Sequence, residues 1–408
     1  MSVFVTDGEQ RATLALVRAL GRAGIPATVG SSHATSLAGC SRYSTRSVRY
    51  PSPVERSADF QASLFREMQD SRYRVLFPMT DITMLLVAQL REALGPLVRV
   101  PVPTEEQITQ AQDKRHVLLL AQQLGMACPS TFMLHEGESL GDVARRVEYP
   151  VVIKPRFSWW LRGGKWACGN VQFAHDADEL TVKYRESHLL IPDPLVQEKI
   201  EGEGRGVFLL VWNGELKAAF CHRRLREKPP WGGVSVYRDS IPFDQELVQK
   251  SFALLRTIGW QGPAMVEFKM DRRDGQAKLM EVNGRFWGSL QLAVDAGLNF
   301  PLLLYRLADG EEVPSQFDYK VGVKSRWLLG DLDHLLIRLT RSGERNGFSP
   351  SDTSKLRACL NFMKLYERDL YYEVFRVGDP APGWYEWRSY VRDLLRRFGS
   401  HAEATRAH

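Results

Sequence analysis

Short apolar runs alternate with longer amphipathic stretches over the first hundred residues. The runs that predict strands occupy residues 3–5, 25–29, 48–50 and 74–78. Residues 11–20 repeat apolar positions with the period of a helix that Gly21 ends, and a second helix is predicted over 81–94. Strands that alternate with helices indicate a parallel sheet, whose ligands bind outside the carboxyl ends of its strands. Residues 1–103 are therefore predicted to form an α/β domain.

Strands and helices follow in a less regular order from residue 104 onward. Capping residues at Thr104 and Asp113 begin two helices, the second over 114–124. Strands are predicted at 149–154, 195–200, 206–212 and 215–222, and helices at 245–258, 290–296 and 301–307. The dipeptide Asn213-Gly214 predicts a hairpin between the last two of these strands.

One further pair of strands, 266–271 and 279–285, carries the strongest chemical signal. The turn-rich link 272–276 joins them, and the alternation of side chains places Glu267 directly across from Glu281, beside Asn283. Like charges directly opposite each other destabilise a hairpin, so this pair favours a bound cation. Two carboxylates and an amide oxygen suit Mg²⁺, which normally also takes phosphate oxygens. The hairpin therefore predicts a nucleotide phosphate site.

Residues 311–408 differ in character from the rest of the chain. Helices rich in Arg, Leu and aromatic residues are predicted near 331–341, 351–363 and 384–398, and residues 400–408 are expected to be disordered. These helices, with Trp327, Trp384, Tyr385 and Trp387, are expected to cover the active site or to form a homodimer contact.

Composition is that of a globular protein, with 44% apolar and 25% charged residues in 408. The net charge of +6 is spread along the chain, which favours anionic ligands but carries no nucleic-acid signature. Five dispersed cysteines with no CxxC argue against a disulfide framework or a zinc knuckle. No signal-peptide pattern and no apolar stretch long enough to span a bilayer are found. We therefore expect a cytoplasmic protein that binds neither nucleic acid nor membrane.

Several motifs in order along the chain resemble the ATP-grasp superfamily, specifically its carboxylate–amine ligases and carbamoyl-phosphate-synthase-like members. They are Asp113-Lys114, Val152-Ile153-Lys154-Pro155, the glycine-bearing loop 156–170, Val196-Gln197-Glu198-Lys199-Ile200, and Glu267 with Glu281-Val282-Asn283-Gly284-Arg285. The resemblance covers roughly residues 1–310. No single motif is specific, and the order and spacing carry the match.

The resemblance implies an α/β protein with the ATP-grasp fold, in which two α+β lobes enclose ATP. Residues 1–103 would be the parallel-sheet pre-ATP-grasp domain, and 104–195 the small lobe with its linking helices. Residues 196–310 would be the large lobe with the metal site, and 311–408 a mostly helical C-terminal extension.

The resemblance also implies a nucleotide site. The residues expected to bind ATP are Lys114 and Lys154 at the phosphates, Gly163 and Gly164 in a flap over them, Gln197, Glu198, Lys199 and Ile200 at the adenine, and Glu203 at the ribose. Glu201 competes with Glu203, and a solvated acidic turn is the alternative for both. Glu267, Glu281 and Asn283 are expected to hold Mg²⁺, with Mn²⁺ as the alternative ion.

The remaining site residues concern catalysis and the substrates. Arg285, Lys154 and Asn283 are expected to be catalytic, and Trp160, His222, Arg224 and Trp287 to contact substrate. His222 is also the one candidate for a general base. The structural alternatives are a loop packed on the body of the domain for Trp160, a basic sheet edge for His222 and Arg224, and ordinary core packing for Trp287.

The function implied is an ATP- and Mg²⁺-dependent ligase. It would activate a small-molecule carboxylate as an acyl phosphate and couple it to an amine, releasing ADP and phosphate. A kinase of the same fold that phosphorylates a hydroxyl is one alternative. A weakly active nucleotide-binding regulatory protein is the other. The sequence does not identify the acid or the amine.

Overall fold

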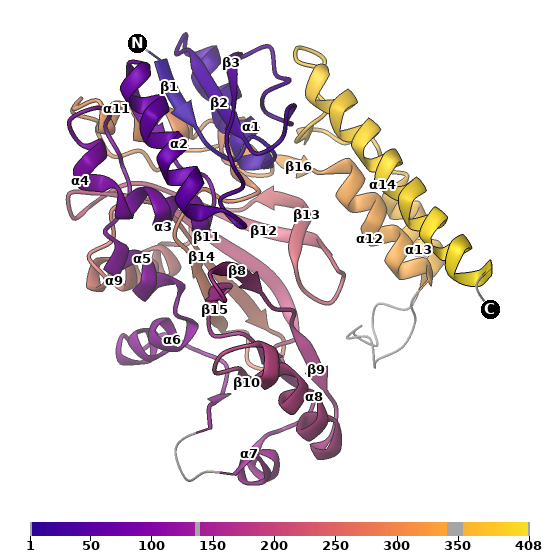
Figure 1. The fold of residues 1–408 in the computed structure, drawn as a ribbon. Helices are drawn as coiled ribbons and strands as arrows, with labels where there is room; N and C mark the ends of the chain where they lie inside the picture. Colours follow the sequence, from indigo (N-terminus) through magenta and orange to yellow (C-terminus); the bar gives the residue numbers. More distant parts are fainter. Residues whose placement is uncertain (1, 135–138, 341–353, 407–408) are drawn as a thin grey trace.

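Residues 2–94 form a parallel four-stranded sheet with helices on both faces, at the top of Figure 1. The computed structural model describes residues 2–134, 139–340 and 354–406. The elements of this domain are β1 (Ser2–Val5), α1 (Arg11–Arg22), β2 (Ala27–Ser31), β3 (Ser44–Arg49), α2 (Ser57–Asp70), β4 (Tyr73–Phe77), α3 (Asp81–Gln89) and α4 (Arg91–Leu94). The order is β3-β2-β1-β4, with α1 packed on one face of the sheet and α2 and α3 on the other.

The small lobe lies at the bottom of Figure 1 and follows two linking helices. Its elements are α5 (Glu105–Gln112), α6 (Lys114–Gln123), β5 (Thr131–Phe132), α7 (Leu140–Arg146), β6 (Val151–Lys154), β7 (Trp159–Arg162), β8 (Lys165–Cys168), β9 (Gln172–Ala174), α8 (Ala177–Leu190) and β10 (Leu195–Glu198). Four of these strands form an antiparallel sheet in the order β5-β10-β6-β9, and β7 and β8 form a separate hairpin. The capping residues expected at Thr104 and Asp113 are present, because each side chain accepts hydrogen bonds from the first turn of its helix.

The large lobe is built on a seven-stranded sheet in the order β15-β14-β11-β12-β13-β16-β17. Its elements are β11 (Gly202–Trp212), β12 (Glu215–Lys228), β13 (Val234–Ser240), α9 (Gln245–Thr257), β14 (Gly262–Asp271), β15 (Ala277–Asn283), α10 (Leu290–Asp295) and α11 (Phe300–Ala308). One face packs on α9. At one end of the strands the other face carries Phe208, Phe220 and Met265, which pack toward α10 and α11. Further along the same face the side chains are charged rather than apolar, so this part of the sheet can face a ligand.

The C-terminal region contributes both to this sheet and to a helical arm. It contains β16 (Lys324–Arg326), α12 (Leu328–Thr340), α13 (Lys355–Phe362), β17 (Leu370–Tyr372) and α14 (Ala381–Arg406). The helices diverge from the body on the right of Figure 1, whereas β16 pairs antiparallel with β13 and parallel with β17. These two strands were not predicted. The expected disorder from residue 400 is wrong as far as Arg406, where α14 ends. The first part of the helix predicted at 351–363 lies outside the described residues.

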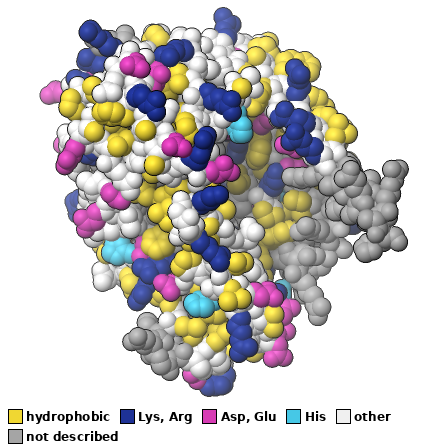
Figure 2. All heavy atoms as spheres, in the orientation of Figure 1, with side chains coloured by type: hydrophobic (Ala, Val, Ile, Leu, Met, Phe, Trp, Pro, Cys, Tyr) yellow, Lys and Arg dark blue, Asp and Glu magenta, His cyan; other side chains and the backbone are white. Residues whose placement is uncertain are grey.

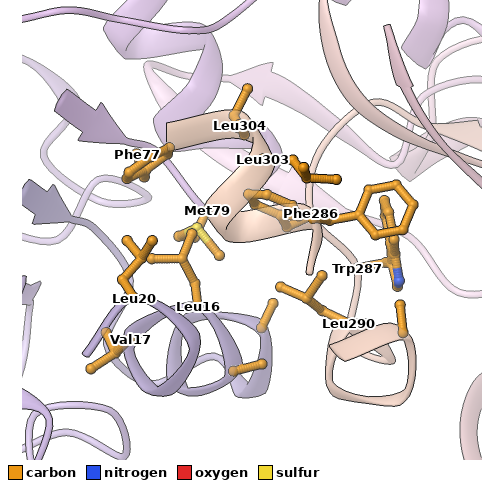
Figure 3. Packing of buried hydrophobic residues seen from close by; sticks show 14 of the residues in the cluster. Leu16, Val17, Leu20, Phe77, Met79, Phe286, Trp287, Leu290, Leu303 and Leu304 are labelled. Carbon is orange, nitrogen blue, oxygen red and sulfur yellow. The ribbon is translucent and has the colours of Figure 1, made fainter. Parts of the chain in front are cut away.

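A common core joins the N-terminal domain to the large lobe. Helix α1 presents Leu16 and Leu20 to Met79 and Phe77, and the same cluster includes Leu290 of α10 with Leu303 and Leu304 of α11 (Figure 3). Burial of large apolar side chains is worth about 1.5–3 kcal/mol each. This shared core therefore fixes the N-terminal domain over the charged half of the large-lobe sheet.

Candidate active site

A cleft of about 1010 Å³ separates the small lobe from the charged face of the large-lobe sheet. The face seen in Figure 2 is hollowed between the main body and the C-terminal part. The residues proposed from sequence that line this cleft are Lys114, Lys154, Gln197, Glu198, Lys199, Ile200, Arg224, Glu267, Glu281, Asn283, Arg285 and Trp287. They come from both lobes, so the fold brings most of the expected nucleotide site together.

The acidic hairpin has the predicted register. Glu267 of β14 is paired with Glu281 of β15, and a bulge follows immediately after Glu267. The amide nitrogen of Asn283 donates to both carboxylates, at 2.9 Å to Glu267 Oε1 and 3.2 Å to Glu281 Oε1. Asn283 therefore holds the two acids together on the wall of the cleft.

Basic residues surround these two acids. Arg224 Nη2 lies 2.5 Å from Glu267 Oε2, and Lys114 Nζ lies 3.7 Å from Glu281 Oε2. Burial raises the pKa of Glu267, and the neighbouring Glu281 adds to that shift. Burial also opposes ionisation of Glu281, but Lys114 and Lys154 outweigh it and hold the pKa of Glu281 below its usual value. Glu281 is therefore the carboxylate that is more firmly ionised.

The donor set fits a hard divalent cation that shares its coordination with a ligand. Among the described residues no group of three or more His, Cys, Asp or Glu side chains is placed to hold a metal ion. The hairpin offers two carboxylates, with an amide that would have to present its oxygen rather than its nitrogen. Mg²⁺ characteristically binds one or two carboxylates and completes its shell with water and phosphate oxygens. Glu267, Glu281 and Asn283 would therefore hold such an ion together with a nucleotide.

Two lysines face the acids from the small-lobe side of the cleft. Lys154 ends β6 and is 8% exposed, and no hydrogen bond among the described residues involves its ammonium group. Burial, reinforced by the positive charge of Lys114, lowers the pKa of Lys154 to about 8. Lys114 donates to Ser158 Oγ at 3.0 Å. A buried ammonium without a protein acceptor is suited to a phosphate oxygen.

The segment expected to hold adenine lies along the cleft where β10 ends. Glu198 Oε2 accepts a hydrogen bond from the backbone N–H of Ser130, and its other carboxylate oxygen pairs with Arg273. Gln197 donates to Thr131 Oγ1 at 2.7 Å. Both oxygens of Glu198 are thus engaged by protein groups. A role of Glu198 at the adenine stays a prediction.

The glycine-bearing segment is a hairpin docked on the N-terminal domain. Gly163 and Gly164, with φ of 58° and 77°, form the exposed turn between β7 and β8 and are not among the residues lining the cleft. Trp166 donates from Nε1 to Ser57 Oγ at 3.2 Å and packs, with Trp159, beside the core under α2. Trp160 is half-buried and likewise does not line the cleft. This structure does not place the two glycines or Trp160 at the cleft, although Gly169 at the end of this segment does line it.

Two further residues proposed from sequence lie away from the cleft. Glu203 faces the opposite side of the sheet, where its carboxylate pairs with Arg205 at 3.2 Å and with Arg223 at 3.6 Å. The ribose role of Glu203 is therefore corrected, and Glu201, paired with Lys199, does not line the cleft either.

His222 lies under the cleft floor. It is fully buried with its ring 4.6 Å from that of Phe208, and neither ring nitrogen has a partner among the described residues. Burial, with the nearby charges of Arg224 and Arg238, lowers the pKa of His222 well below its usual value. We therefore correct the two expectations that His222 contacts substrate and that it acts as the general base.

Other cleft residues were not predicted. They include Ser158, Lys228, Ser235, Arg238, Lys269 and, from α12, Ile337. Arg238 and Ser235 lie on β13, a strand that sequence reasoning missed although Val234, Val236 and the aromatic Tyr237 are typical strand formers. Ile337 shows that the C-terminal region forms one side of the cleft.

A second cavity, of about 410 Å³, adjoins the first at Arg285 and Gly288. It lies at the carboxyl ends of the N-terminal strands, where the alternation pattern predicted a ligand. Its other lining residues include Asp7, Glu9, His33, Tyr50, Asp81 and Trp159. Arg285 Nε donates to Asp81 Oδ2 at 2.9 Å, so Arg285 stands between the two cavities.

Comparison with known proteins agrees with this architecture. Residues 191–329 match a family model described as ATP-grasp in the biosynthetic pathway with Ter operon. A carbamoyl phosphate synthase large chain from Methanosphaerula palustris is 25% identical over 270 residues, which are 63% of this chain and 24% of that protein. This chain thus spans about a quarter of that relative.

Solved structures share the fold at low sequence identity. The L-amino acid ligase from Bacillus licheniformis aligns with a TM-score of 0.62 and 18% identity, over 79% of this chain and 78% of that one. Biotin carboxylase from Campylobacter jejuni aligns with a TM-score of 0.63 and 14% identity, over 79% and 74% of the two chains. None of the described helices is long and apolar enough to cross a membrane.

Proposed function

We propose that this chain, which is an ATP-grasp protein, is an ATP- and Mg²⁺-dependent ligase that joins a carboxylate to an amine. The observation that carries the proposal is the pairing of Glu267 with Glu281 across the cleft from Lys154, a buried lysine whose ammonium has no hydrogen-bond acceptor among the described residues. Acids on one wall and a lysine on the other suit a nucleotide triphosphate with its metal ion. The likeness to an L-amino acid ligase and to a carbamoyl phosphate synthase supports ligation as the reaction.

The chain's own residues supply positioning and charge. Lys114 and Lys154 bind phosphate oxygens, and Glu267, Glu281 and Asn283 hold Mg²⁺, which when bound neutralises charge on the phosphates. Arg285 orients the substrate carboxylate, because a guanidinium binds a carboxylate through two parallel hydrogen bonds. The backbone at Lys199 and Ile200, which line the cleft, would hold the adenine.

The reaction proceeds in two displacements. A carboxylate oxygen of the acid attacks the γ-phosphorus, and the bond to the bridging oxygen breaks to release ADP. The amine nitrogen then attacks the acyl carbon, and inorganic phosphate leaves with the electron pair of the C–O bond. Water must be excluded meanwhile, since it would hydrolyse the acyl phosphate. Ser158 and Gly169, which flank the β7–β8 hairpin, and Ile337 line the cleft where such exclusion is needed.

We place the substrate carboxylate, which accepts the phosphoryl group, at the junction of the two cavities. Arg285 lines both of them, so a substrate held by Arg285 has one end at the phosphates and the other in the smaller cavity. That cavity carries Asp7, Glu9 and Asp81 together with Arg11 and Arg285 in its walls, and Asp81 is already paired with Arg285.

The test is a screen of ATP consumption against pools of carboxylates and amines, with mass spectrometry of the products. An amide product formed with equimolar ADP and phosphate is the expected result. A phosphorylated hydroxyl compound without amide would replace ligation by kinase activity. Nucleotide binding with no acid- or amine-dependent ADP release in any pool would instead identify a regulatory nucleotide-binding protein.

A further inference from the structure

Two arginines face each other on neighbouring strands of the cleft. Arg224 of β12 is paired in register with Arg238 of β13, and both line the cleft on the face that carries Glu267. Like charges directly opposite each other on adjacent strands destabilise a sheet. Each guanidinium therefore needs its own negative partner.

The two arginines are compensated unequally. Arg224 has two carboxylates of its own, Glu267 at 2.5 Å and Glu227 at 3.1 Å. Arg238 Nη2 lies 2.6 Å from Oε2 of Glu373, but Arg11 pairs with the same oxygen. One carboxylate thus serves two guanidinium groups. Arg238 is fully buried, and burial lowers its pKa because Glu373 compensates its charge only in part.

Unused hydrogen-bond donors occur on Arg238 and on two other residues of the cleft. The Nε of Arg238, the Nε1 of Trp287 and the hydroxyl of Ser235 are each buried without a hydrogen-bond partner among the described residues. All three side chains belong to residues that line the cleft. A buried donor left without an acceptor costs about 1–3 kcal/mol. A carboxylate would accept hydrogen bonds from the two N–H donors and the hydroxyl. It would also balance the positive charge that Glu373 compensates only in part.

We propose that Arg238, Trp287 and Ser235 form a subsite for a substrate carboxylate that is not the one activated. The inference rests on the proposed ligase function. Strand β13 is three strands away from β14, about 14 Å at the usual spacing, so a group at Arg238 is remote from the acids that hold the metal. The reacting carboxylate belongs beside Arg285. The second one belongs either to a dicarboxylic acid or to an amino acid that supplies the amine.

Acetate is the probe for this subsite, because it reports a carboxylate without requiring turnover. The indole Nε1–H of Trp287 gives its own resonance in a ¹⁵N spectrum of the tryptophan-labelled full chain, identified by its loss in W287F. Titration of acetate, in the presence of Mg²⁺ and a non-hydrolysable ATP analogue, is expected to shift that resonance saturably. R238Q should weaken the apparent affinity about tenfold or more.

Matched variants separate the subsite from general effects. R223Q removes an arginine from the neighbouring strand β12, on the opposite face of the sheet, where Arg223 pairs with Asp239, and it should leave the acetate response unchanged. R238K keeps the charge and should retain a weaker response, which guards against a folding defect in R238Q. The proposal is overturned if the wild-type resonance does not shift, or if it shifts equally in R238Q. Either result would mean that water alone satisfies these donors.

The substrates that the turnover screen identifies then show whether the acid or the amine carries the second carboxylate. If the acid carries it, R238Q raises KM for the dicarboxylate and leaves KM for its monocarboxylate analogue unchanged. If the amine carries it, the same contrast appears between an amino acid and its decarboxylated counterpart. Equal KM effects on both members of each pair would overturn the assignment. A screen without any ligase product would defeat the proposed function and leave the acetate result standing.

Discussion

Arg18 of α1 and Asp379 of the C-terminal region form a buried ion pair, with Nε 2.8 Å from Oδ2, although 361 residues separate them. The other donors of Arg18 are used as well, because its two Nη atoms donate to the backbone carbonyls of Glu373 and Val374 at 2.9 Å. Ser41 and the backbone N–H of Arg42 also donate to Asp379. The segment that brings Glu373 to Arg238 is therefore locked to the N-terminal domain.

Loss of this pair should destabilise the whole protein. Asp379→Asn leaves the Arg18 guanidinium buried without its counter-charge, and breaking a buried pair in this way typically costs about 3–5 kcal/mol. Equilibrium unfolding in urea measures the change. Glu311→Gln, which removes the exposed partner of Arg306, is the control and should change the free energy of unfolding little. A D379N protein as stable as its parent would show that the pair is not a structural tie.

A chain ending at residue 310 should not fold to a stable monomer. The truncation removes β16 and β17 from the large-lobe sheet, exposes the edge of β13, and leaves Arg18 and Arg238 without Asp379 and Glu373. Size-exclusion chromatography with circular dichroism checks this. A truncated chain that is monomeric, cooperative in its unfolding and active would contradict the structural role of the C-terminal region.

Glu281→Gln should abolish most nucleotide turnover while preserving the hairpin. Glutamine keeps the volume but removes the negative charge that faces Lys114 and the expected metal. Removing one well-placed electrostatic group from an active site lowers kcat by about 100-fold to 1000-fold. ADP release with the true substrates is the measurement, and Asp274→Asn in the turn of the same hairpin is the control. Equal ADP release by E281Q and the parent would refute the metal assignment.

Nucleotide affinity should fall as pH rises through about 8. Lys154 has a pKa near 8, and a phosphate favours its protonated form. Below that pH the ammonium is already charged. Above it, binding must take up a proton, so Kd for ATP should increase by up to about tenfold per pH unit until the pKa of the complex is reached. Titration calorimetry between pH 6.5 and 9.5 tests this.

The control for this pH dependence is Lys154→Met. It should bind ATP more weakly at every pH and lack the change near pH 8. A parent protein whose affinity is flat across this range would show that Lys154 does not contact the phosphates.

Trp166→Ala should free the β7–β8 hairpin from the N-terminal domain. The substitution removes the hydrogen bond to Ser57 and the ring packed beside the α2 core. Trypsin should then cut several-fold faster at the exposed Arg162 and Lys165, as followed by mass spectrometry. Leu161→Ala, which truncates a side chain already 61% exposed on the same hairpin, is the control. Equal cleavage of the two variants would show that Trp166 does not anchor the hairpin.

The predictions that held were those that depend on near neighbours in sequence. The ATP-grasp fold is confirmed, as are the parallel N-terminal sheet and the register of Glu267 with Glu281. Alternation of side chains and the length of a turn decide a hairpin's register locally. Caps such as Asp113 act within one turn of their own helix, for the same reason.

The predictions that failed concerned which face of an element meets the ligand. Glu203 and Gly204 are adjacent on β11, yet only Gly204 lines the cleft. His222 lies on the cleft face of β12, but the rings of Phe208 and Trp287 pack there and close it off. The alternation of side chains along a strand indicates that two adjacent residues face opposite sides of the sheet. It does not indicate which side of the sheet faces the ligand.

The sequence alone determined the acidic hairpin and the lysine that ends β6, because each follows from propensity and spacing over a few residues. Only the tertiary structure decided that Glu373 meets both Arg11 and Arg238, of which Arg238 lines the cleft. A buried charge is stable when an opposite charge reaches it, and the chain is free to supply that partner from any distance along its length. Such a contact leaves no local pattern, so the second substrate subsite became visible only in the folded chain.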